Sequence, residues 1–244
     1  MAEPIKMSEH VYALPINAVM MGTPTTIFPA LILDETHGAT LVDTGILGME
    51  GLFQAALQTL SLSWTDVKRI IVTHHDLDHI GSLPAIVAAT GAEVLALETE
   101  VPYVQGEKPG QKQPSPEMIA GMPPEMLAVF ANPPKAHVTQ VLHDGEVLDL
   151  AGGVKVIATP GHTVGHLSLY VQQDGVLITG DALTSAGGQL NGPSARMTPD
   201  MDEAQRSVRK LAQESAKAVL TYHGGLVLED AAAQLVRVAA EADS

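Results

Sequence analysis

The chain has 244 residues, of which 45% are hydrophobic and 3% aromatic, and its formal net charge is −15. This length fits one large domain or two small ones with an aliphatic core, while the acidic charge disfavours a nucleic-acid partner. The absence of cysteine excludes disulfides and thiolate metal sites. No apolar run approaches the ~18 residues of a membrane span, and the polar start does not read as a signal peptide, so we expect a cytoplasmic protein without membrane contact.

The first hundred residues alternate between predicted strands and helices. Apolar runs predict strands at 11–16, 28–33, 39–42, 67–72 and 93–97. Apolar residues at helical spacing predict helices over 49–60 and 83–90. Pro15 suggests that the first strand is an edge strand, and Ser82 can cap the second helix.

A proline-rich segment at 101–135 interrupts this alternation. It contains eight prolines, and Met118, Met122 and Met126 recur every fourth residue between them. The segment could be a surface excursion packed by its own methionines, or a lid that gives a substrate pocket an adaptable apolar wall. We favour the lid, because a stiffened excursion of this length commonly serves a site.

The second half of the chain is rich in strands and repeats a feature of the first. The predicted strands are 140–142, 147–150, 154–158, 167–171, 176–179 and 218–221. A Gly- and Ser-rich loop is expected at 186–195, and helices are expected over about 202–215 and 228–239. The hairpin that ends at Asp181 resembles the hairpin that ends at Asp43. Two similar halves predict two sheets packed face to face with helices outside.

A polar cluster follows the strand 67–72. It contains His74, His75, Asp76, Asp78 and His79 within six residues. Imidazole and carboxylate groups are the usual protein ligands of zinc, iron and manganese. Two carboxylates in one turn repel each other unless a cation lies between them. The cluster therefore favours a metal site over a solvated acidic loop.

Three further strands end in residues that can bind a metal. His162 follows 154–158, Asp181 follows 176–179 and His223 follows 218–221, each close to a glycine that lets the backbone turn sharply. Open α/β sheets bind ligands at the carboxyl ends of their strands. Four such ends could together supply enough ligands for two cations.

These elements, in this order and spacing, resemble the metallo-β-lactamase-fold hydrolase superfamily, in its glyoxalase II-like and lactonase-like branch. The matching motifs are Asp43-Thr44-Gly45, Thr73 to Gly81, Pro160 to His166, Gly180-Asp181 and His223. The resemblance covers nearly the whole chain. It implies an α/β fold, namely a four-layer αββα sandwich of two mixed β-sheets with outer helices. It also implies a single domain over 1–244, with 101–135 as a lid-like insertion.

The resemblance further implies two divalent metal ions bridged by Asp181. It assigns His74 and His162 to the first ion, and Asp78, His79 and His223 to the second. The family has a histidine where Asp76 stands; because a carboxylate can also bind a metal, Asp76 is expected to complete the first site. Zinc is the expected ion, with iron or manganese as alternatives because Asp76 makes the site harder. Occupancy of the second site alone remains open.

The other polar residues near the motifs receive supporting roles or none. Asp43 is expected to orient a ligand, His166 to hydrogen-bond a ligand loop, and His75 to lie behind the ligands or in solvent. The remaining histidines have no context that marks them as ligands; they are His10, His37, His137 and His143.

The predicted activity is hydrolysis of a carboxylic ester, thioester or lactone of small size by a metal-bound hydroxide. Asp78 and Asp181 are the predicted catalytic residues, with Asp78 also passing a proton to the leaving group. The alternatives are a mononuclear iron oxygenase like the persulfide dioxygenases, a β-lactam or phosphoester hydrolase, and a metal-binding protein without catalysis. A homodimer could form through the lid or the strand 11–16.

Overall fold

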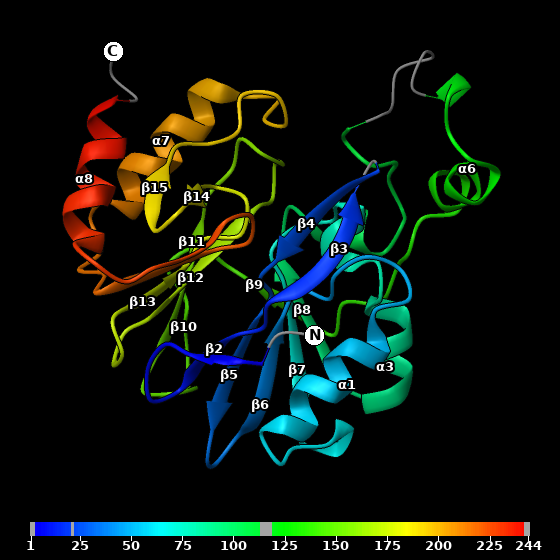
Figure 1. Cartoon of the computed structure of the whole chain (residues 1–244), viewed down its shortest axis with the longest axis horizontal. Coiled ribbons are helices and arrows are strands. Elements are labelled where there is room, and N and C mark those ends of the chain that lie inside the picture. Colours follow the sequence, from blue (N-terminus) through cyan, green and yellow to red (C-terminus); the bar gives the residue numbers. More distant parts are fainter. Residues whose placement is uncertain (1–2, 21, 113–118, 242–244) are drawn as a thin grey trace.

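Two β-sheets lie face to face, and helices cover both outer faces (Figure 1). The computed structural model describes residues 3–20, 22–112 and 119–241. Each sheet contains both parallel and antiparallel neighbours. The predicted αββα sandwich of two mixed sheets is therefore confirmed.

The first sheet comes from the N-terminal half and has the order β1-β2-β5-β6-β7-β8-β9. Its neighbours are antiparallel from β1 to β6 and parallel from β6 to β9. The strands are β1 Ile5–Lys6, β2 Val11–Ala13, β5 Ala30–Asp34, β6 Gly38–Val42, β7 Val67–Val72, β8 Glu93–Leu97 and β9 Gln140–Leu142.

The second sheet has the order β10-β11-β12-β13-β16-β17, in which only β13 and β16 run parallel. Its strands are β10 Val147–Leu148, β11 Val154–Ala158, β12 Leu167–Val171, β13 Val176–Ile178, β16 Ala218–Thr221 and β17 Gly225–Val227. Two hairpins lie outside both sheets; they are β3 Ile16–Met20 with β4 Thr23–Ile27, and β14 Thr184–Ala186 with β15 Gln189–Asn191.

The helices form the two outer layers. α1 (Glu50–Thr59) and α3 (Leu83–Thr90) pack on the first sheet, whereas α7 (Met201–Leu211) and α8 (Ala231–Glu241) pack on the second. The remaining helical segments are η1 Trp64–Asp66, α2 Leu77–Ile80, α4 Val101–Val104 and α6 Pro124–Ala131. None of the helices in the described part of the chain is long and apolar enough to cross a membrane.

Strand alternation divides the core into three layers. In β7, Ile70 and Val72 point to the helices α1 and α3, while Ile71 points to the second sheet. In β12, Leu169 faces the first sheet and Tyr170 faces α7 and α8. Strands with apolar residues on both faces are typical of sheets covered on both sides. This explains the continuous apolar runs that predicted them.

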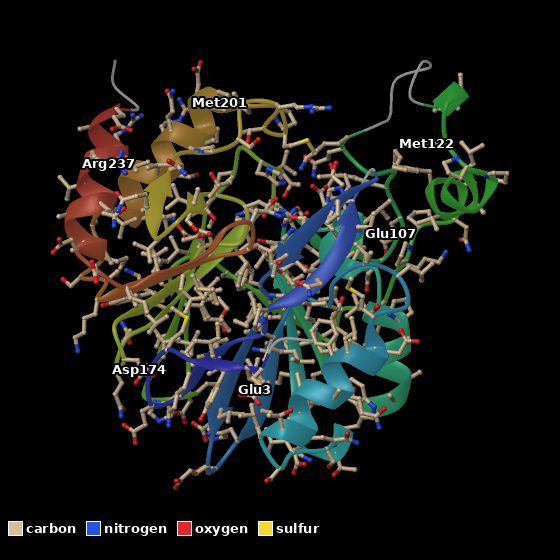
Figure 2. All side chains as sticks on the ribbon, in the orientation of Figure 1. Glu3, Glu107, Met122, Asp174, Met201 and Arg237 are labelled. Carbon is tan, nitrogen blue, oxygen red and sulfur yellow. The ribbon has the colours of Figure 1, made fainter. Side chains whose placement is uncertain are left out.

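The predicted repeat between the two halves is present in the structure. β5–β6 and β12–β13 are both antiparallel hairpins, and the second strand of each then pairs in parallel with the strand beyond. Asp43 follows the first hairpin and Asp181 the second, so both reach the same end of the sandwich. At the opposite end, Asp174 accepts hydrogen bonds from Ser8 and the backbone of His10, which joins the sheets there (Figure 2).

The structure corrects three local predictions. Residues 11–16 form not one edge strand but β2 and the start of β3, and β1 lies outside β2. Part of the loop predicted at 186–195 belongs to the β14–β15 hairpin. The Ser82 hydroxyl does not cap α3; it donates to the carbonyl of Ile46 and accepts from the N–H of Met49, at the start of α1. These pairings depend on distant segments, which local patterns do not report.

Of the segment 101–135, the described residues 119–135 carry α6 and extend to one side of the sandwich (Figure 1). Met122 lies on this part (Figure 2). Met118 and the side chain of Met126 lie outside the described part, so the methionine face stays a prediction.

We expect Leu169→Ala to lower the free energy of unfolding by about 2–5 kcal/mol, because it removes a fully buried side chain between the two sheets. Urea denaturation followed by circular dichroism measures the change. The control is Val236→Ala on α8, a residue that is 59% exposed; it should shift stability by no more than about 0.5 kcal/mol. Equal effects of the two variants would contradict this assignment of the core.

Candidate metal centre

Two groups of His and Asp side chains meet where the strands of both sheets end. The first cluster contains His74, His162 and Asp181, and the second contains Asp78, His79 and His223. Within each cluster, one nitrogen or oxygen atom per residue lies within 4.8 Å of the others. The structure therefore brings together all the predicted ligands, with Asp76 beside the first cluster.

The first cluster follows β7, β11 and β13. His162 Nε2 lies 3.3 Å from Asp181 Oδ2. The Asp76 Oδ2 atom lies 3.3 Å from His74 Nε2 and 3.1 Å from His162 Nε2. Asp76 therefore faces the two histidines that were predicted to share a metal ion with it.

The second cluster follows β7 and β16. His223 Nε2 lies 3.2 Å from Asp78 Oδ2 and 3.4 Å from Asp181 Oδ2. His79 Nε2 lies 3.4 Å from the other Asp181 oxygen and 3.8 Å from Asp78 Oδ2. Asp181 thus contacts both clusters, which is the position predicted for a bridging ligand.

Several buried atoms of these residues lack a hydrogen-bond partner. They are His74 Nε2, His79 Nε2, His162 Nδ1 and Asp181 Oδ1. Buried polar atoms without partners are costly, and a metal ion would satisfy atoms of this type. The residues present therefore fit divalent cations.

Asp43 fixes the orientation of the histidine ligands from behind. Its carboxylate accepts hydrogen bonds from the N–H of Thr73 (2.8 Å), the Thr73 hydroxyl (2.7 Å) and His79 Nδ1 (2.8 Å). Because the Thr73 hydroxyl donates to Asp43, it accepts from His74 Nδ1 at 3.0 Å. Both histidines therefore carry a proton on Nδ1 and present Nε2 to the site. The backbone of Asp43 adopts a left-handed conformation with φ of 65°.

His166 hydrogen-bonds a ligand loop, as predicted. Its Nε2 accepts a hydrogen bond from the N–H of Asp181 at 3.0 Å, so its Nδ1 donates to the Thr159 hydroxyl at 2.8 Å. Gly180 makes this contact possible, since a Cβ there would lie 2.8 Å from His166 Nε2. His166 thus positions Asp181, and both of its ring nitrogens are engaged in these hydrogen bonds.

Tyr222 supports the second cluster from below. Its ring stacks on the ring of His79 with a centroid distance of 3.7 Å, and its hydroxyl donates to the carbonyl oxygen of Asp78. The sequence predicted His223 but not its neighbour. Only the tertiary structure reveals Tyr222 as a support, because its partners lie about 140 residues earlier.

The electrostatic field differs between the two clusters. Burial lowers the pKa of His74 well below its usual range, and the charge of His79 adds to this effect. Burial also opposes protonation of His79, but the carboxylates of Asp181, Asp43 and Asp78 outweigh it and raise the pKa well above its usual range. In the same way Asp181 and Asp78 overcome burial and raise the pKa of His223 to about 10.

The carboxylate of Asp181 stays ionised. Burial disfavours its charge, yet the positive charges of His79 and His223 hold its pKa well below the usual range. The second cluster therefore attracts positive charge, and a metal ion would compete there with protons on the imidazoles.

Glu100 and His75 connect the site to the segment 101–135. Buried Glu100 accepts hydrogen bonds from the backbone N–H (2.9 Å) and Nδ1 (2.5 Å) of His75 and from the hydroxyl of Thr163 (3.1 Å). His75 Nε2 accepts from the N–H of Gln111 at 3.1 Å, and its ring stacks on Tyr103. His75 therefore lies behind the ligands, and its predicted alternative placement in solvent is wrong.

Lys112 is the main residue that sequence reasoning missed. Its Nζ atom hydrogen-bonds Asp76 Oδ2 and lies 2.6 Å from His162 Nε2. A lysine in a proline-rich segment carries no local signal of such a contact.

The other histidines have partners outside both clusters. His10 contacts Asp174, His37 contacts Asp34, His137 contacts Gln105 and His143 contacts Glu98. None of the four belongs to either cluster.

Comparison with known proteins relates the whole arrangement to one family. The family model described as the metallo-beta-lactamase superfamily matches residues 27–223. The probable metallo-hydrolase YflN of Bacillus subtilis is 32% identical over 204 residues, which cover 78% of this chain and 76% of that protein.

Two further relatives extend the comparison. A hydroxyacylglutathione hydrolase of Edwardsiella ictaluri is 29% identical over 182 residues, covering 73% of this chain and 55% of that enzyme. The crystal structure of a metallo-beta-lactamase family protein from Thermus thermophilus superposes with a TM-score of 0.71 and 27% identity. The superposition covers 96% of this chain and 79% of that one.

Zinc should stabilise the chain, and His79→Ala should remove most of this effect because it deletes a ligand of the second cluster. Free zinc at about 100 times its dissociation constant adds about 2.7 kcal/mol of stability. Thermal unfolding with and without zinc measures the shift. His143→Ala, which changes an exposed histidine away from the clusters, should keep the full stabilisation. Equal zinc shifts in both variants would exclude His79 as a ligand.

Asp43→Asn should weaken metal binding by about 10–100-fold, since an amide cannot accept all three hydrogen bonds that hold Thr73 and His79. Asparagine tolerates the left-handed backbone at this position, so the fold should persist. Competition with a chromogenic chelator measures the affinity. The matched control is Asp34→Asn, which alters another carboxylate that accepts backbone N–H groups, at a turn away from the site. A control that loses as much affinity would show that Asp43 has no specific role.

Proposed function

Because the chain belongs to the metallo-beta-lactamase superfamily, we propose that it is a metal-dependent hydrolase of a small carboxylic ester, thioester or lactone. The observation that carries the proposal is the convergence of six His and Asp side chains from four strand ends. Four of the six hold buried atoms without hydrogen-bond partners. A catalytic metal site requires nitrogen and oxygen atoms whose lone pairs converge in a buried place.

The two clusters supply donor atoms for metal ions, and the contacts of Lys112 with Asp76 and His162 limit how tightly the first cluster would hold one. Asp78, His79 and His223 would bind one ion, His74 and His162 would face the other with Asp76 beside them, and Asp181 would contact both. Zinc is the expected ion, with iron or manganese as alternatives because of Asp76. When bound, such ions lower the pKa of coordinated water to about 7 and polarise the scissile carbonyl.

The chain's own residues would orient the metal ligands and protonate the leaving group. Asp43 and Thr73 keep the Nε2 atoms of His74 and His79 directed into the site, so that no ligand has to reorganise during the reaction. Asp78 lies at the accessible side, with its Oδ2 atom 3.2 Å from His223 Nε2. We assign Asp78 the transfer of a proton to the leaving group, and Asp181 the placement of the nucleophile.

Two observations support an acyl substrate. One relative is named a hydroxyacylglutathione hydrolase, which is an enzyme for an acyl compound. The segment 101–135 offers exposed apolar side chains; they are Ile119, Leu127 and Phe130. The net charge of −15 disfavours polyanionic substrates. In this proposal the segment serves as the apolar wall of the substrate pocket.

Asp181→Ala should lower kcat/KM by at least about 10³-fold on any ester, thioester or lactone that the wild type cleaves, because it removes a group shared by both clusters. A chelator should abolish turnover, and metal should restore it in the wild type alone. The assay uses p-nitrophenyl esters, acyl thioesters and acyl lactones, with His143→Ala as the control. Turnover that survives in Asp181→Ala would contradict the proposal. Oxygen uptake with a persulfide, without hydrolysis of any probe, would favour the oxygenase instead.

A further inference from the structure

We propose that the ammonium group of Lys112 is the resident cation of the first cluster, so that the protein holds one tightly bound metal ion, in the second cluster. This inference rests on the metal-binding part of the proposed function but not on the reaction that follows. It concerns how this chain departs from the two-ion arrangement that its resemblance implies.

The contacts of Lys112 compete directly with a metal ion. Its Nζ atom donates to Asp76 Oδ2 and lies 2.6 Å from His162 Nε2. An ammonium group has only donors, so the lone pair of His162 Nε2 must accept this hydrogen bond. That single lone pair cannot point to a metal ion at the same time. Lys112 therefore engages two of the atoms that a first ion would need.

The charge balance points in the same direction. Asp76 adds a negative charge where the family pattern has a neutral histidine, next to Asp181. A buried or half-buried carboxylate needs a nearby positive charge. Lys112 supplies that charge, and the side chains of the pair are similarly shielded, with 19% exposed for Lys112 and 17% for Asp76. The acidic substitution and the lysine thus form one ion pair.

The backbone beside Lys112 is held in place by the ligand loops themselves. The N–H of Gln111 donates to His75 Nε2 at 3.1 Å, and the Gln111 side-chain oxygen accepts from the N–H of Val164 at 3.0 Å. One anchor belongs to the turn that carries Asp76, and the other follows His162. These two hydrogen bonds fix the backbone next to Lys112, so that its side chain is directed at the first cluster.

The second cluster has a different character. His79 Nε2 and Asp181 Oδ1 have no hydrogen-bond partner, and within the described residues no lysine or arginine is recorded against Asp78, His79 or His223. Its lone pairs remain available to an ion. Removing the Lys112 ammonium would leave a similar set at the first cluster, formed by His74, Asp76, His162 and Asp181.

The test measures the number of zinc ions per chain. Full-length protein is equilibrated with zinc, separated from free zinc by gel filtration and analysed for metal content. We expect about one ion per chain for the wild type, and about two for Lys112→Met and for Lys112→Gln, because each removes the competing ammonium. Lys112→Arg retains the charge and should stay at about one. The matched control Lys108→Met changes a lysine that lies over the Tyr103 ring and should also stay at one.

Two zinc ions in the wild type, or one in both neutral variants, would overturn the inference. If the neutral variants keep one ion but raise KM only for esters that carry a carboxylate, Lys112 binds substrate and the inference also falls. Turnover measured on the same samples separates the two proposals. If the number of zinc ions per chain rises from one in the wild type to two in the neutral variants, but no probe is turned over, the inference is supported and the proposed hydrolase activity is contradicted. If the wild type binds two zinc ions and turns over a probe, the hydrolase activity is supported and the inference is contradicted.

Discussion

The central constraint in this structure is electrostatic. Four aspartates lie among the imidazoles at one end of the sandwich; Asp43 and Asp181 are buried, and Asp76 and Asp78 are half-buried. Carboxylates at such short range require positive charge, which protons, metal ions or a lysine can supply. The raised pKa values of His79 and His223 express this demand. These groups are held together by the strand ends, by the turns that follow them and by the segment that carries Gln111 and Lys112.

The two sheets place the His and Asp side chains of the site by the same repeated strand arrangement. Each sheet contains a hairpin whose second strand leads to an aspartate, followed by a parallel strand that leads to histidines. The two aspartates have different tasks: Asp43 hydrogen-bonds His79 from behind, while Asp181 faces both clusters. His166 then fixes Asp181 through its backbone N–H. Rigid strands thus place the ligands, and a second set of hydrogen bonds orients them.

The first part of the segment 101–135, up to Lys112, belongs to this arrangement. Glu100 joins the turn after β7 to the loop that carries His162, and His75 extends the network to Gln111. Lys112 follows directly and meets Asp76. A departure from the family pattern at one position is therefore matched by a charge from a segment 36 residues further along the chain. This pairing joins residue 112 to the first cluster.

The sequence alone determined most strands of the two sheets, the sandwich class and the set of converging His and Asp side chains, because continuous apolar runs and terminal His and Asp residues are local features. It also distinguished His166 as a supporting residue. It did not report Lys112, Glu100 or Tyr222, nor the β3–β4, β14–β15 and β17 pairings. Each of these depends on a partner distant in the chain, and only tertiary packing decides which distant groups meet. Whether Asp76 faces a metal ion or an ammonium group is such a decision, since the residue type permits both and the neighbour selects one.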